Sequence, residues 1–373
     1  MIVTADYLCP VRGLTSLEAP HPETLLKSAR AAKDLGLDRI TLPLLEESLA
    51  GGSKARVKFL DGLVLALDQI GESGLSGSVI APASKLLAIR WAPPYLVHGY
   101  RDPEAPPVFV DGALRTLRPL NWWADPALIQ GRLKLFRELL SAVAGHPCLK
   151  RWILLDRAFE CCRPEPEQAE FVLRSYIAEV REKDETAEIV LGLGRSDLLR
   201  PHPALGVVSL VDTIRLSGSE YSISGLPVLS RLEDEAKVSA FLTAVSIWLF
   251  EKPLETQVGL GLSRGPGDPE AVMENILRIA ATGASSLNWM SLIDPEPWLR
   301  DTIPWTSREG LSRTGLLDPG MEPRRHAEEW VRAARAAEKG GMSSDFIDIS
   351  KEEYLTDPAM HIDRLWDHFL EAL

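Results

Sequence analysis

The sequence alternates short apolar runs with longer stretches in which apolar residues recur at the helical period. This alternation constrains the fold strongly, because repeated strand and helix units of this kind build a parallel sheet. We predict strands over 2–9, 38–44, 77–81, 149–155, 188–193, 211–216, 254–260 and 285–292. We predict helices over 22–36, 54–70, 126–143, 165–183, 233–250, 269–281 and 324–339.

Eight such units in about 340 residues match the size and order of a (β/α)8 TIM barrel. No linker or composition shift divides the chain, so we predict one barrel over 1–341 with long loops after the third and eighth strands. The segment after the third strand, 82–124, reads as irregular and is rich in Pro, Gly and aromatic residues. Residues 342–373 are predicted to form a polar tail that packs outside the barrel, with a short helix over 362–370.

Charge and apolar patterning exclude several kinds of partner. The 53 acidic and 41 basic side chains give a formal net charge of −12, which opposes binding to nucleic acid or to an anionic membrane surface. No apolar run approaches the roughly 18 residues of a membrane helix. Asp6 and Arg12 interrupt the start of the chain where a signal peptide needs an apolar core, so we expect a cytoplasmic protein. The sequence gives no indication of the oligomeric state.

The cysteines and glycines carry no cofactor signature. Cys9, Cys148, Cys161 and Cys162 lack metal-ligand spacing, so we interpret them as reduced thiols and expect no metal. The two Gly-Leu-Gly runs, at 192–194 and 259–261, do not continue into a nucleotide-binding pattern. We therefore predict no cofactor.

The chemistry of such a barrel lies at the carboxyl ends of its strands. Several tryptophans fall on that side of the predicted barrel. Their faces can stack on pyranose rings, and nearby amides can bind hydroxyl groups, which favours a carbohydrate ligand in an aromatic cleft. The predicted sugar-binding residues are Trp91, Trp122, Trp123, Asn288, Trp289 and Trp305.

Four segments resemble retaining glycoside hydrolases built on (β/α)8 barrels, the cellulase-like and β-galactosidase-like clan. They are 146–157 (HPCLKRWILLDR), 252–259 (KPLETQVG), 283–294 (GASSLNWMSLID) and 315–323 (GLLDPGMEP). The resemblance spans most of the chain and implies a barrel that binds carbohydrate. It places Asp156 at an Asn position of the family, Arg157 at the acid/base Glu and Gln257 at the nucleophilic Glu.

These substitutions bear on activity, because retaining hydrolysis needs two carboxyl groups roughly 5 Å apart. An amide forms no stable glycosyl ester, and an arginine stays protonated at neutral pH. Other carboxylates follow the predicted strands and could form a wider, inverting pair. They are Glu46, Glu47, Asp156, Glu160 and Glu220, of which Asp156 or Glu160 with Glu220 is the pair to test.

Three interpretations stay open. In the first, the protein binds a carbohydrate and its hydrolysis of glycosidic bonds is lost or doubtful. In the second, it is a diverged glycosidase that uses the non-standard carboxylates Asp156, Glu160 and Glu220. In the third, it is another barrel enzyme that acts on a small anionic molecule, as arginines near strand ends would allow. These arginines are Arg12, Arg90, Arg157 and Arg195.

Overall fold

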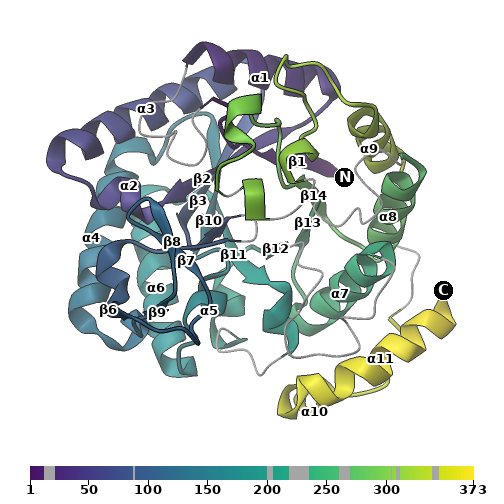
Figure 1. The fold of residues 1–373 in the computed structure, drawn as a ribbon. Helices are drawn as coiled ribbons and strands as arrows, with labels where there is room; N and C mark the ends of the chain where they lie inside the picture. Colours follow the sequence, from purple (N-terminus) through teal and green to yellow (C-terminus); the bar gives the residue numbers. More distant parts are fainter. Residues whose placement is uncertain are drawn as a thin grey trace.

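The computed structural model describes residues 1–11, 22–86, 89–199, 205–217, 235–259, 269–303, 305–307, 311–337 and 344–373. Eight parallel strands close into a barrel in the order β1, β14, β13, β12, β11, β10, β3 and β2. Helices surround this barrel (Figure 1), which confirms the predicted (β/α)8 fold. The barrel strands are β1 Ile2–Asp6, β2 Arg39–Leu45, β3 Ser76–Ala83, β10 Leu149–Leu154, β11 Glu188–Gly194, β12 Thr213–Ser217, β13 Leu254–Val258 and β14 Ser286–Trp289.

The outer helices bury one apolar face each against the barrel. In α3, for example, Phe59, Leu63, Ala66 and Leu67 recur at helical spacing and are fully buried. The described helices are α1 Pro22–Leu35, α2 Glu46–Ala50, α3 Ser53–Glu72, α4 Pro126–Val143, α5 Ala158–Cys161, α6 Pro166–Lys183, α7 Glu235–Phe250, α8 Pro269–Ala281, α9 Arg325–Ala336, α10 Lys351–Thr356 and α11 Pro358–Ala372.

The insertion after β3 is not the irregular loop that the sequence indicated. It contains short strands in two small sheets, one in the order β4, β5, β7, β8 and one that pairs β6 with β9. These strands have two to five residues, too few for a periodic pattern to show in the sequence. They are β4 Lys85–Leu86, β5 Ile89–Trp91, β6 Val97–Arg101, β7 Val108–Val110, β8 Ala113–Arg115 and β9 Leu117–Pro119.

The C-terminal tail forms two helices and lies outside the ring of helices (Figure 1). The Ser350 hydroxyl caps α10 by accepting a hydrogen bond from the Glu353 N–H at 3.1 Å, and the Asp357 carboxylate caps α11. Phe369 of α11 packs against Phe241 of α7 with ring centroids 5.4 Å apart. The tail is thus held on the barrel by aromatic contacts.

Candidate functional site at the barrel mouth

A pocket opens at the carboxyl ends of the barrel strands, and we call it the mouth pocket. Counting space open to solvent, it has a volume of about 290 Å³. Its lining comes from the carboxyl-terminal parts of five barrel strands, β1, β3, β10, β13 and β14, or the residues directly after them, and from the insertion after β3. The lining residues are Asp6, Leu8, Ile80, Lys85, Leu86, Asp156, Arg157, Gln257 and Met290. This is the face on which barrel enzymes carry their active sites.

Asp6, the last residue of β1, is buried in the lining of this pocket. Its Oδ2 accepts hydrogen bonds from Arg215 Nη2 at 2.7 Å and from Gln257 Nε2 at 2.8 Å. Its Oδ1 accepts another from Asn288 Nδ2 at 3.0 Å. Burial raises the pKa of Asp6 to about 6, although Arg215 opposes the shift.

Asp156 follows β10 and lines the same pocket. Its Oδ1 accepts a hydrogen bond from Ser217 Oγ at 2.8 Å, and Ser217 is also bonded to Arg215 Nε at 2.9 Å. Burial raises the pKa of Asp156 above its ordinary range, against the charges of Arg215 and Arg157. A chain of polar contacts thus joins the carboxyl groups of Asp6 and Asp156.

Glu160 lies in α5 between two cations. Lys85 Nζ contacts its Oε2 at 2.7 Å, and the Arg157 guanidinium donates from Nε at 3.2 Å and from Nη2 at 3.0 Å. Burial opposes ionisation, but the charges of Arg157 and Lys85 outweigh it and lower the pKa of Glu160 to about 2. This environment holds a permanent carboxylate and does not suit a proton donor at neutral pH.

Gln257 and Asn288 lie side by side, in register on β13 and β14. The Gln257 amide donates from Nε2 to Asn288 Oδ1 at 3.3 Å, in addition to its bond with Asp6. Asn288 donates to Thr4 Oγ1 at 2.8 Å and is fully buried. Asn288 is therefore part of the hydrogen-bonded floor below the mouth pocket, whereas Gln257 reaches the pocket itself.

The tryptophans predicted to bind sugar are all buried and have different surroundings. Trp289 points outward from β14, stacks on His326 and packs against Trp330 of α9, because neighbouring strand residues face opposite sides. Trp305 packs in a small apolar cluster with Leu8 and Met290, two lining residues of the mouth pocket. Sugar contact by these rings stays a prediction.

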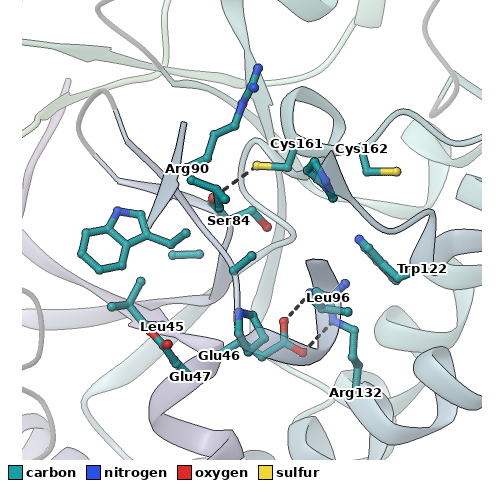
Figure 2. A pocket seen from close by; sticks show the side chains of 16 residues that line it. Leu45, Glu46, Glu47, Ser84, Arg90, Leu96, Trp122, Arg132, Cys161 and Cys162 are labelled. Atoms are coloured by element: carbon teal, nitrogen blue, oxygen red, sulfur yellow. Dashed lines mark hydrogen bonds and ion pairs between the residues drawn. The ribbon is translucent and has the colours of Figure 1, made fainter. Parts of the chain in front are cut away.

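Trp91 and Trp122 line a second pocket, which we call the lateral pocket. It lies between the ends of β2 and β3, the small sheets and α4, and has a volume of about 560 Å³ including space open to solvent. Figure 2 shows Trp122 above Arg132, whose guanidinium carbon lies 3.6 Å from the centre of the ring. Trp123 lies behind Trp122, stacked on it with centroids 4.0 Å apart, and does not line the pocket.

The remaining predicted site residues have different surroundings. Glu46 binds Arg132 in the lateral pocket, with Nη2 and Oε2 2.6 Å apart. Arg195 donates to Ser239 Oγ at 2.8 Å and is buried. Glu220 and Arg12 lie outside the described residues, so the pairing of Asp156 or Glu160 with Glu220 stays a prediction.

Sequence reasoning missed Asp6 and Lys85, which line the mouth pocket, and Arg215 and Asp197, which lie outside its lining. Asp197 accepts a hydrogen bond from the Gly194 N–H at 2.8 Å, and burial together with the charge of Glu160 raises its pKa to about 7. In the sequence, Asp6 could have been recognised because polar residues occupy every second position of an apolar strand, as Thr4 and Asp6 do. Such residues share one face of the strand.

Two features are absent from the described residues. No set of three or more His, Cys, Asp and Glu side chains there is grouped closely enough to hold a metal ion. Within the same residues, no helix combines the length and the apolar character needed to cross a bilayer.

The fold is similar to that of several solved glycoside hydrolases. A GH5_18 protein from Streptomyces cattleya, in complex with GlcNAc, has a TM-score of 0.72 at 15% identity, over 91% of this chain and 82% of that one. A GH5_18 protein from Bifidobacterium longum subsp. infantis has a TM-score of 0.70 at 15% identity, over 92% and 81%. The exo-beta-1,4-mannosidase from Opitutaceae bacterium strain TAV5 has a TM-score of 0.69 at 18% identity, over 90% and 59%.

Sequence comparison adds nothing to this similarity. No protein-family model matches the chain, and no curated protein is similar to it in sequence. The resemblance seen in the four sequence segments is thus supported at the level of structure, and the chain has the barrel fold of glycoside hydrolases.

Proposed function

We propose that this protein is a carbohydrate-binding barrel that uses the mouth pocket and does not perform retaining hydrolysis. The observation that carries the proposal is the presence of Arg157 and Gln257 together in the lining of that pocket. The family resemblance assigns these two positions to the catalytic glutamates. Neither side chain present can attack an anomeric carbon or protonate a leaving group at neutral pH.

The hydrogen bonds of the two side chains support the same conclusion. The Arg157 guanidinium is directed to Glu160 through two of its nitrogens, and the Gln257 amide nitrogen to Asp6 and Asn288. Both are therefore held in place within a buried network. A fixed set of donors and acceptors around a small pocket suits recognition of hydroxyl groups.

The structural neighbours indicate which sugars to test. The GH5_18 protein from Streptomyces cattleya was solved with GlcNAc, and a point variant of GH5_18 from the same organism was solved with Manβ1-4GlcNAc. We expect calorimetric titration of this protein with these two sugars to detect binding, and we expect Gln257→Ala to weaken it about tenfold by removing a buried hydrogen-bonding group. Gln130→Ala, an exposed amide in α4, is the matched control and leaves affinity unchanged.

A second candidate function is hydrolysis by a diverged mechanism with Asp156 as general acid. It is favoured by the raised pKa of Asp156, a property that a proton donor needs, and by its place in the pocket lining. Turnover of aryl mannosides or aryl N-acetylglucosaminides that is lost in Asp156→Asn would establish this function instead. If a broad glycan panel shows neither binding nor turnover, the proposed function is wrong.

A further inference from the structure

Gln257 lines the mouth pocket, and its amide nitrogen is held by two buried oxygen atoms. Nε2 donates to Asp6 Oδ2 at 2.8 Å and to Asn288 Oδ1 at 3.3 Å. An amide nitrogen carries two hydrogens, so these two bonds use both of them. The carbonyl oxygen Oε1 is the polar atom of Gln257 that neither bond involves.

The orientation of the Asn288 amide is fixed from its other side. The Thr4 hydroxyl donates to the Leu287 carbonyl oxygen at 3.2 Å, so its oxygen accepts from Asn288 Nδ2 at 2.8 Å. The same nitrogen donates to Asp6 Oδ1 at 3.0 Å. Because the network determines which way an amide points, Asn288 turns its oxygen, rather than its nitrogen, towards Gln257.

Asp6 acts only as an acceptor in this arrangement. Its two oxygens accept from three N–H donors, at 2.7 Å from Arg215, 2.8 Å from Gln257 and 3.0 Å from Asn288. Donors directed at a carboxyl group favour its ionised form. The side chain at position 257 therefore faces two acceptor oxygens, one of which belongs to a carboxylate, and it must be a hydrogen-bond donor.

The charged groups that face Asp6 lie on β12, on β13 and in the turn after β10. Burial raises the pKa of Asp6 to about 6; Arg215 of β12 opposes the shift, and Asp156 and Glu255 add to it. At pH 8 the carboxyl group is thus ionised, and a second carboxylate at position 257 would be repelled by it. The other charged residues of the pocket lining are Lys85 and Arg157, both bound to Glu160.

We propose that Asp6 is a positioning residue of the mouth pocket, which requires a donor at position 257 and thereby fixes the orientation of the Gln257 amide. Gln257 then meets a ligand through its carbonyl oxygen, as an acceptor for a hydroxyl group. The same requirement excludes the glutamate that the family resemblance assigns to position 257. The ligand contact rests on the function proposed above, whereas the coupling of the two side chains does not.

A cycle of variants tests this coupling through the stability of the protein at pH 8. Gln257→Glu brings two carboxylates together, so we expect its melting temperature to lie several degrees below that of the wild type. Adding Asp6→Asn restores a donor opposite a carboxylate and keeps the net charge, so the double variant should melt above Gln257→Glu alone. Gln257→Met, of similar size and without hydrogen bonds, is the matched control that Asp6→Asn does not rescue. Losses that add in the double variant would overturn the proposal.

The pH dependence of Gln257→Glu is a second test, and it leaves Asp6 intact. The charge of Asp6 raises the pKa of a carboxyl group at position 257 above its value in the unfolded chain. The loss of melting temperature should therefore be largest at pH 8 and shrink as the pH falls to 5, and it should change less in Gln257→Met. An equal loss of Gln257→Glu at both pH values would overturn the proposal, even if the double variant does not fold.

Sugar binding separates this inference from the proposed function. In calorimetric titration with GlcNAc at pH 8, we expect Asp6→Asn to weaken binding about tenfold, and the double variant with Gln257→Glu to regain most of the affinity. Wild-type affinity in Asp6→Asn would contradict the positioning role. If the wild type binds no sugar and Asp6→Asn still rescues the stability of Gln257→Glu, the proposed function is wrong and the coupling of Asp6 with Gln257 is confirmed.

Discussion

Two glycines of β11 leave space for the carboxylates of Asp156 and Glu160. A Cβ atom on Gly192 would lie 2.8 Å from the Cβ atom of Asp156, and one on Gly194 would overlap the Glu160 carboxylate. Real Cβ atoms do not approach other heavy atoms so closely. The position of the ion pair between Glu160 and its two cations thus depends on the absence of a side chain at 194.

We expect Gly194→Ala to displace Glu160 and to lower the free energy of unfolding by about 1–3 kcal/mol, the usual cost of overpacking a buried site. The matched control is Gly131→Ala on the exposed side of α4, where an added Cβ meets nothing within 4 Å. That change should stabilise the protein by about 0.5–1 kcal/mol, because alanine favours helix more than glycine does. Urea unfolding of both variants checks the prediction, and equal stability of the two would contradict it.

Removing the Glu160 charge should lower the free energy of unfolding more than Gly194→Ala does. Glu160→Gln leaves Lys85 and Arg157 with an uncharged neighbour in a buried site, and we expect a loss of about 3–5 kcal/mol at pH 7. The measurement is urea unfolding of the variant and the wild type. A loss below about 1 kcal/mol, typical of an exposed pair, would contradict the burial of this cluster.

The Glu160 carboxylate should also make the free energy of unfolding depend on pH. Its pKa is lowered from 4.5 to about 2 in the folded protein, so its stabilisation is complete above pH 4.5 and is lost as the pH falls towards 2. The difference in unfolding free energy between wild type and Glu160→Gln should therefore shrink between pH 5 and pH 2.5. A constant difference across this range would show that Glu160 titrates normally.

The sequence located some site residues and missed others for a physical reason. Arg157 and Gln257 were found because the family resemblance assigns them, and the structure places both in the mouth pocket. Asp6 was missed because apolar residues continue after it, so the first strand was predicted to end near Cys9. Arg215 was missed because it lies inside an apolar run, and only barrel closure shows that its side chain turns inward.

At the scale of elements, regular units could be predicted and the insertion could not. The helix predicted over 126–143 matches α4, which has apolar periodicity along its length and the Asp125 side chain as its N-cap. The strands of the insertion are held by pairing between distant segments, as in β5 with β7, and their sequences are too short to show it. In the tail, Asp357 and Pro358 start α11 earlier than the predicted residue 362, since Pro suits the first helical turn.

Helix α11 is attached to the barrel through the ring of Phe369. Phe369 contacts Phe241, Phe346 and Trp366, and it is fully buried. We expect Phe369→Ala to cost about 3–5 kcal/mol through lost burial and a cavity. The neighbouring Leu370 is 40% exposed, so Leu370→Ala should change stability by no more than about 0.5 kcal/mol. Thermal unfolding followed by circular dichroism separates the two, and equal shifts would mean that α11 is not anchored by this ring.

For the whole molecule, charged side chains run through the barrel from its amino-terminal end to the mouth. Glu188 accepts from Arg39 at 3.5 Å at the start of the strands, and Arg151 lies 3.4 Å from the same carboxylate. Arg151 then binds Glu255, and Glu255 binds Arg215 at 3.2 Å, which binds Asp6 at 2.7 Å. Barrel interiors of this fold are usually filled by branched apolar residues, and this row of charged side chains departs from that pattern.

Glu255 is the carboxylate on which this chain of charges depends most, because it bridges two arginines and its side chain is 0% exposed. Those arginines outweigh burial and lower its pKa, so it is ionised in the folded protein.

Glu255→Gln leaves two buried guanidinium groups without their shared counter-charge, and we expect the free energy of unfolding to fall by about 3–5 kcal/mol. Glu188, 31% exposed at the open end of the same chain, is the matched control, and Glu188→Gln should cost less than about 1 kcal/mol. Urea unfolding of both variants measures the difference between their losses of unfolding free energy. The Glu255 contacts join three barrel strands, so tryptophan fluorescence and circular dichroism should report the same unfolding transition. Similar losses in the two variants would mean that solvent screens the charge of Glu255 as strongly as that of Glu188. The buried charged side chains would then contribute little to the stability of the barrel.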